Sequence, residues 1–131
     1  MKSKDLFIIP AIFAILIVLF VDLWALAQSY AEDCQRAREY FRKALEIKHQ
    51  SEDMKALMEK EQLYRKALEL CPDYPEAHNN LGDVYENLGR YAEAIEEYTR
   101  AIELKSNFAV PHFGLGDTYF KNGNYKEAIK W

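Results

Sequence analysis

Apolar and polar positions divide the chain into two regions with different periodicity. Residues 6–21 (LFIIPAIFAILIVLFV) form an apolar run without a polar side chain, which Asp22 interrupts. From residue 30 onward, apolar residues recur every three or four positions, as in amphipathic helices. Five glycines and four prolines in 131 residues are too few for a strand-and-turn fold. We therefore predict an all-α chain: a hydrophobic N-terminal helix followed by packed helices.

The N-terminal region has the three parts of a secretory signal peptide. Lys2 and Lys4 precede the apolar run, and Ala25 and Ala27 form a small-x-small site at its end. This pattern predicts cleavage after Ala27, with residues 1–27 removed. Export is predicted whether the segment is cleaved or stays in the membrane as an anchor. In both cases Lys2 and Lys4 lie inside and the residues after the segment lie outside. The expected location is periplasmic or otherwise extracytoplasmic, or membrane-anchored and facing outside.

The alternative to cleavage is a retained transmembrane anchor, with membrane association through residues 6–27. Sixteen apolar residues span about 24 Å of helix, short of the roughly 30 Å hydrocarbon core. Counting on to Ala27 gives enough length but buries Asp22 near the outer boundary. A retained anchor helix is expected to run on into residues 30–48, because no glycine or proline occurs between Ala11 and Cys71. A buried core helix of a cytosolic protein is the least favoured interpretation.

The remainder of the chain contains an internal repeat of 34 residues. Residues 75–95 align with residues 109–129 without a gap, and ten of the 21 positions are identical. The identical pairs are His78/His112, Leu81/Leu115, Gly82/Gly116, Asp83/Asp117, Tyr85/Tyr119, Gly89/Gly123, Tyr91/Tyr125, Glu93/Glu127, Ala94/Ala128 and Ile95/Ile129. This period indicates a tandem array of one structural unit.

Each unit is predicted to be an antiparallel helical hairpin. Leu81, Tyr85 and Leu88 make one apolar stripe. Gly82 lies inside the stripe, where a missing side chain lets the partner helix approach closely, and Gly89 is expected to end the helix in a left-handed cap. A second helix then begins near Tyr91. We predict helices over residues 75–88, 91–104 and 109–122.

These residues resemble the tetratricopeptide repeat (TPR) family. The family pattern is present as Leu81-Gly82, Tyr85, Gly89-x-Tyr91, Ala94, Tyr98 and Ala101. Two positions depart from it, since His78 and His112 replace the first aromatic and Ser106 replaces the closing proline. The resemblance implies a right-handed α-solenoid, with one unit over residues 75–108 and an incomplete unit over residues 109–131. The early end of that unit predicts a fragment of a longer protein.

Upstream of the repeats, residues 28–74 are expected to form an irregular capping hairpin. Its helices are predicted over residues 30–48 and 52–71, with a turn near His49 and Ser51 as the N-cap of the second helix. Cys34 and Cys71 fall at the open end of this hairpin, so a disulfide is feasible in an oxidising compartment. Two buried free thiols are the alternative.

The sequence provides no support for catalysis. Motifs of phosphate loops, zinc proteases and serine hydrolases are missing, and neither cysteine has a plausible base nearby. His78 and His112 are interpreted as packing residues, because no acidic or thiol partner recurs beside them for a metal. The net charge of -4 comes from interspersed residues without a basic stripe, which argues against nucleic acid. We predict no enzyme activity, cofactor or metal.

The TPR resemblance implies a concave groove that receives a peptide or a partner protein. Carried over by position, the groove residues are Glu76, Asn79, Asn80, Asp83, Glu86, Asn87, Phe113, Asp117, Phe120 and Lys121. They describe an acidic to neutral groove with an aromatic floor. The predicted function is a non-catalytic, extracytoplasmic protein-interaction scaffold. The alternatives are a recognition arm of a longer enzyme whose catalytic domain lies beyond residue 131, and a structural module that stacks end to end.

Overall fold

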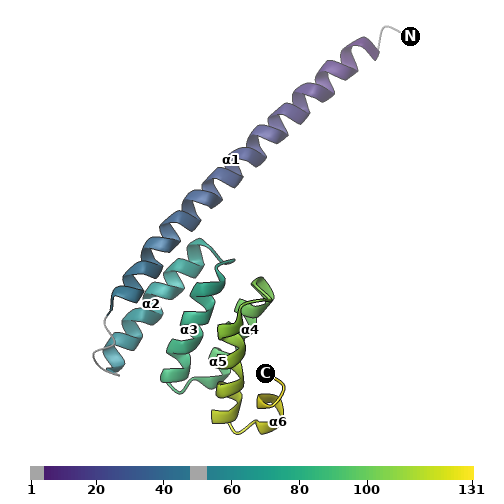
Figure 1. Ribbon diagram of the computed structural model, residues 1–131. Coiled ribbons are helices and arrows are strands. Elements are labelled where there is room, and N and C mark those ends of the chain that lie inside the picture. The colour runs from purple at the N-terminus through teal and green to yellow at the C-terminus, as the bar shows by residue number, and fades with distance from the viewer. Residues whose placement is uncertain (1–4, 48–52) are drawn as a thin grey trace. The chain divides into compact units, whose positions relative to one another are not determined.

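The computed structural model describes residues 5–47 and 53–131, and these residues form six helices and no strand. In chain order the helices are α1 (Asp5–Glu46), α2 (Met54–Leu70), α3 (Pro75–Asn87), α4 (Tyr91–Leu104), α5 (Ala109–Lys121) and α6 (Tyr125–Ala128) (Figure 1). The predicted all-α class is confirmed, and α3, α4 and α5 lie within one residue of the predicted helices. The chain divides into two compact units, Met1–Asp33 and Cys34–Trp131.

Helix α1 carries the apolar run of the sequence. Its large apolar side chains from Ile12 to Leu26 are all exposed, and none of the most apolar 18-residue window is buried. By length and composition this helix could cross a membrane. It does not end at Ala27 but continues to Glu46, because no glycine or proline interrupts it after Ala11.

Helix α2 begins after an aspartate cap. Asp53 has extended backbone angles, and its Oδ1 accepts a hydrogen bond from the backbone N–H of Lys55 at 3.2 Å, as expected of an N-cap. The predicted cap, Ser51, lies outside the described residues, and the helix begins at Met54 rather than at residue 52. The prediction of Ser51 as the cap was wrong because aspartate caps a helix as well as serine does and Asp53 is nearer to the first helical turn.

Glycines close the first helix of each repeat. Gly89 has φ +73° and Gly123 has φ +78°, a left-handed conformation that glycine adopts without strain. The N–H of Arg90 donates to the carbonyl oxygen of Tyr85 at 2.8 Å, and that of Asn124 donates to Tyr119 at 2.9 Å. Both ends therefore have the hydrogen bonding of a Schellman motif, which confirms the cap predicted at Gly89.

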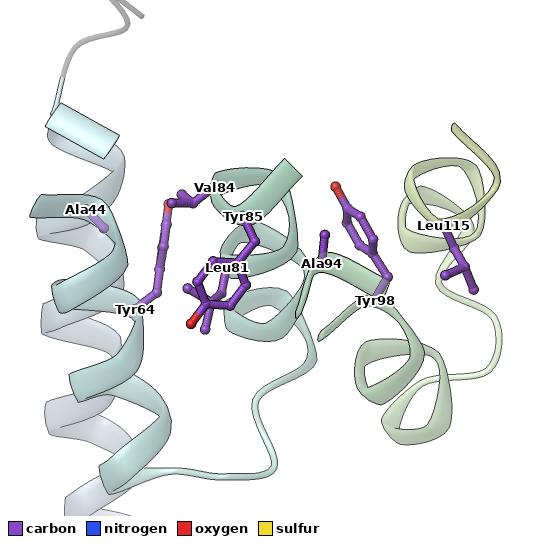
Figure 2. Close-up of a cluster of buried hydrophobic side chains, with 8 residues drawn as sticks. All are labelled: Ala44, Tyr64, Leu81, Val84, Tyr85, Ala94, Tyr98 and Leu115. Atoms are coloured by element: carbon purple, nitrogen blue, oxygen red, sulfur yellow. The ribbon is translucent and has the colours of Figure 1, made fainter. Parts of the chain in front are cut away.

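The main core runs through the interior of the helical hairpins. Figure 2 shows its eight buried side chains in a row from the first helix to the fifth: Ala44, Tyr64, Leu81, Val84, Tyr85, Ala94, Tyr98 and Leu115. Two alanines and three tyrosines lie along this row together with Leu81, Val84 and Leu115, and the tyrosine rings fill space that the short alanine side chains leave open. The row links the capping hairpin to both repeat units.

Tyr98 is the residue that most clearly joins the two repeat units. It is 1% exposed, and a Cβ built on Gly82 of α3 would lie 2.8 Å from its ring. A Cβ on Gly114 of α5 would lie 2.6 Å from the same ring. The ring of Tyr98 thus occupies a slot that exists only because two glycines, 32 positions apart in the sequence, lack side chains.

A smaller core holds the capping hairpin together. Ala37 of α1 and Ala67 of α2 are completely buried beside Cys71. The ring centroid of Phe41 lies 5.6 Å from that of Tyr64 and 4.9 Å from that of Tyr74. The structure joins Cys34 to Cys71 in a disulfide, with 4.7 Å between their Cα atoms. The hairpin lacks the Leu-Gly-x-x-Tyr pattern of a repeat, and aromatic packing and a covalent bond take its place.

Candidate functional site

The predicted groove residues all come from α3 and α5, the first helices of the two repeat units. These helices contact each other directly, although they are separated in the sequence by α4. In the structure the predicted residues form two groups: an exposed apolar stripe on α5, and a polar network that connects α3, α4 and α5. The two groups have different roles.

The apolar stripe consists of Val110, Phe113 and Phe120. Their spacing of three and seven residues places them on one face of α5. Phe113 is 79% exposed and Phe120 is 60% exposed, so neither belongs to the core. Phe120 contacts the ring of Tyr125 on α6 edge-on, with 5.3 Å between centroids. The stripe is a surface whose aromatic side chains the fold itself does not bury.

The polar network is centred on the hydroxyl of Tyr98. This hydroxyl donates to Oδ1 of Asp83 at 2.6 Å and lies 3.3 Å from Oε2 of Glu86. Burial and the hydrogen bond to Asp83 raise the pKa of Tyr98, so the hydroxyl remains a donor. The Thr118 hydroxyl of α5 donates to the same Glu86 oxygen at 2.8 Å. The network therefore links Asp83 and Glu86 of α3 to Tyr98 of α4 and Thr118 of α5.

Lys121 neutralises part of this network. Its Nζ lies 2.8 Å from Oδ2 of Asp117 and 2.5 Å from Oε1 of Glu86. The two carboxylates raise the pKa of Lys121 through these hydrogen bonds. Three predicted groove carboxylates thus share one lysine, one threonine and one tyrosine within the chain. The groove is less acidic toward a ligand than its sequence suggests.

Asp83 should make the stability of the repeats dependent on pH. Burial among its neighbours raises the pKa of Asp83, the Tyr98 hydrogen bond lowers it, and the charge of Glu86 raises it; the net shift is upward. A raised carboxyl pKa means that the folded state favours the protonated form, so stability falls as pH rises through the folded pKa. At neutral pH, Asp83→Asn is therefore expected to be at least as stable as the wild type.

The pH dependence of the difference tests this expectation. Chemical unfolding of both proteins should show the advantage of Asp83→Asn at pH 7 and its loss below about pH 3.8, where the Asp83 carboxyl is protonated in both states. Glu96→Gln serves as the control, because Glu96 is a carboxylate of α4 outside the network. An advantage of Asp83→Asn that grew toward acid pH would contradict the assignment.

The asparagines of the predicted groove are engaged within the chain. Asn79 is only 4% exposed, and its Nδ2 donates to Oδ1 of Asn80 at 3.1 Å. Nδ2 of Asn80 donates to the Tyr64 hydroxyl at 3.3 Å, and Nδ2 of Asn87 donates to the backbone oxygen of Asp83 at 2.7 Å. These amide donors position α3 against α2 and brace its last turn. Glu76 forms an ion pair with Lys105 at 3.1 Å.

The two repeat histidines share a backbone contact. Nε2 of His78 lies 2.9 Å from the carbonyl oxygen of Pro72, and Nε2 of His112 lies 3.4 Å from that of Ser106. A carbonyl only accepts, so both nitrogens act as donors. His78 also places Nδ1 2.6 Å from Oε2 of Glu97 on α4. Within residues 5–47 and 53–131 no three potential ligands cluster for a metal, and the contacts are those of packing residues.

Sequence reasoning missed the polar network and a second polar surface. The aspartate that recurs at positions 83 and 117 was a signal for the network. The hydroxyl donors to the α3 carboxylates, Tyr98 and Thr118, lie on α4 and α5, so the sequence did not show the pairing. The second surface is a hollow of about 430 Å³ over α2, α3 and α4, whose wall includes Glu69, His78 and Glu96. Arg90 bridges it at one end by contacts with Glu61 and Glu93. None of the predicted groove residues lines this hollow.

Comparison with family models identifies the repeats. Residues 63–96 match a model described as tetratricopeptide repeat, and residues 87–123 match one described as TPR repeat. The first match begins at residue 63 and so includes the second half of α2. A comparison with curated protein sequences gave no match.

Solved structures of similar fold include the protein MamA. One MamA crystal structure is 30% identical over 56% of this chain and 43% of that protein, with a TM-score of 0.55. A MamA point mutant aligns over 88% of this chain and 86% of that one at 20% identity, with a TM-score of 0.63. An O-GlcNAc transferase mutant of Thermobaculum terrenum aligns over 77% of this chain and 18% of that one at 22% identity, with a TM-score of 0.61. The chain spans less than half the length of the first of these MamA structures.

Proposed function

Because residues 63–123 are tetratricopeptide repeats, we propose that this chain is an extracytoplasmic interaction scaffold that binds a protein partner through the face formed by α3 and α5. Repeats of this family mediate protein–protein interaction, and the α-solenoid fold is that of an interaction module. The proposal of an extracytoplasmic location rests on Lys2 and Lys4 before the apolar run, which favour the later residues outside whether the run is cleaved or retained.

The observation that carries the binding site is the exposure of Phe113 and Phe120. Two large aromatic side chains on one helix face are 79% and 60% exposed, although the same fold buries Tyr98 and Tyr85. Exposed aromatic side chains grouped on one surface favour contact with another molecule, because that contact removes their apolar area from water. Val110 extends the stripe along α5.

The spacing of the two phenylalanines suggests what kind of ligand fits. Seven residues of helix separate them by about 10.5 Å along the axis. A peptide in the polyproline II conformation advances about 3.1 Å per residue with three residues per turn, so apolar residues three positions apart lie on one side of it and would meet both rings. A partner helix would meet them with apolar residues about seven positions apart. The proposed ligand therefore carries a pair of apolar anchors at one of these spacings.

Charge is expected to have a secondary role in this site. Asp83, Glu86 and Asp117 already have donors within the chain, in Tyr98, Thr118 and Lys121. A basic residue of the ligand would have to compete with Lys121 for the same oxygens. The carboxylates should therefore affect association rate and salt dependence more than final affinity. No residue of the face has a catalytic role in this proposal.

Truncating either phenylalanine is expected to weaken binding without unfolding the repeats. Peptides selected from a random displayed library against the full chain in detergent would serve as ligands, with affinities measured by fluorescence anisotropy. Phe113→Ala and Phe120→Ala should each cost on the order of 2 kcal/mol or more, which is roughly a thirty-fold loss of affinity. Their thermal midpoints should remain near that of the wild type, because both rings are exposed.

Met58→Ala is the matched control for this experiment. Met58 lies on α2 and is 52% exposed, so the variant removes a similarly exposed apolar side chain away from the proposed face. Equal loss of affinity in Met58→Ala, or unchanged affinity in both phenylalanine variants, would reject the α5 stripe as the anchor.

A further inference from the structure

The first part of α1 presents apolar side chains in every direction. From Ile12 to Leu26, twelve large apolar residues are more than half exposed, and they follow one another almost without interruption. An amphipathic helix of a soluble protein keeps such residues to one stripe. A helix that is apolar all round has either a protein core or lipid around it. None of the most apolar 18-residue window of α1 is buried within the described residues, and lipid is the surrounding that fits such a helix.

The dimensions of the segment match a lipid bilayer. Residues 6–27 form 22 helical residues of about 1.5 Å rise, which gives about 33 Å against a hydrocarbon core of roughly 30 Å. Trp24 lies near the distal end, where aromatic side chains commonly sit at the membrane interface, and Lys2 and Lys4 precede the segment. Asp22 is about five residues from the end, close enough to lie near the interfacial region.

The structure also bears on whether this segment is removed. Ala25 and Ala27, the candidate cleavage site, lie in the interior of the helix Asp5–Glu46. Leu23, Trp24 and Leu26 continue the helix there, and no glycine or proline weakens it. A protease acts on a helical site only after local opening of the backbone.

We infer that residues 6–27 are a retained anchor that spans a lipid bilayer, not a signal peptide that is removed. This inference goes beyond the proposed binding function, because it concerns what holds the scaffold and not what the scaffold binds. It commits to the bilayer as the occupant of the apolar surface of α1. It departs from the sequence pattern of residues 1–27, whose basic start, apolar run and small-x-small site favoured cleavage after Ala27.

Fractionation and intact-mass measurement of the full chain test the anchor. The chain, with a C-terminal tag, would be expressed in a bacterial host, with a reporter carrying a cleavable signal peptide as an internal check of processing. We expect the chain in the membrane fraction after an alkaline carbonate wash, with a mass that includes residues 1–27. A mass that begins at Gln28, release by carbonate, or a soluble full-length chain would each overturn the inference.

A charge placed inside the span provides a second test. The double variant Leu16→Arg/Leu19→Arg puts two charges near the bilayer centre, and at least a ten-fold fall in the carbonate-resistant fraction is expected. Gln28→Arg/Ser29→Arg, outside the span, is the matched control and should remain membrane-bound. Equal retention of both variants would overturn the inference. Peptide binding is measured separately on the detergent-solubilised chain. The anchor can therefore fail while the binding proposal holds, and the binding proposal can fail while the anchor holds.

Discussion

Replacing Tyr98 by alanine is expected to destabilise the repeat unit by about 3–5 kcal/mol, the cost of removing a large aromatic side chain from a core. Tyr98 is 1% exposed and lies between Gly82 and Gly114, so its removal leaves a cavity bounded by two helices that lack side chains at that point. The surrounding backbone cannot collapse into this space without moving α3 toward α5. Thermal or urea unfolding followed by circular dichroism measures the loss.

Tyr98→Phe separates the hydrogen bond from the packing. Phenylalanine keeps the ring but removes the donor to Asp83, so a smaller loss of about 1 kcal/mol is expected. Asp83 is exposed, so water can replace the lost donor, which limits the penalty. Tyr125→Ala is the control, because Tyr125 of α6 is an exposed tyrosine. The interpretation is wrong if Tyr98→Ala proves no more destabilising than Tyr98→Phe.

Removing the disulfide is expected to cost about 4 kcal/mol, the loop-entropy value for a closed loop of this size. Cys34 and Cys71 are 37 positions apart, and their bond holds the start of the capping hairpin to its end. The double variant Cys34→Ala/Cys71→Ala keeps both positions apolar, so no buried thiol or hydroxyl complicates the comparison. Its thermal midpoint should fall by roughly 10 °C or more.

Reductant provides the internal control for the disulfide. Dithiothreitol should lower the midpoint of the wild type to that of the double variant and should leave the double variant unchanged. Non-reducing peptide mapping of protein made in an oxidising compartment should find the Cys34–Cys71 pair. A wild-type midpoint that does not respond to reductant would show that packing alone holds the hairpin.

The repeat region could be predicted from sequence because its signals are local. The 34-residue period, the glycines that end helices and the apolar stripes each depend on residues within one hairpin, and α3, α4 and α5 agree with the predicted helices. The steric role of Gly82 was also predictable, since a glycine inside an apolar stripe implies a close approach. Its partner, the ring of Tyr98, follows from the hairpin.

The site was harder to predict because its interactions cross between units. Glu86 of α3 meets Thr118 and Lys121 of α5, which lie 32 and 35 positions later. Side-chain type at each position indicated an acidic surface, but only the packing of α3 on α5 shows which carboxylates already have donors. The start of α2 was missed for a simpler reason, since aspartate and serine compete equally well as caps.

The slot around Tyr98 means that this protein cannot be lengthened by simple duplication of its sequence repeat. The ring is supplied by residues 75–108, but one wall of its slot, Gly114, belongs to the unit that begins at residue 109. A tandem copy of residues 75–108 would place a second Asn80 at the position of Gly114, against the ring. Tyr64 tolerates Asn80 as a neighbour because its hydroxyl accepts the amide at 3.3 Å, whereas Tyr98 leaves no room for even a methyl group. Gene duplication or modular design would therefore have to carry the aromatic of one unit together with the glycine of the unit that follows it.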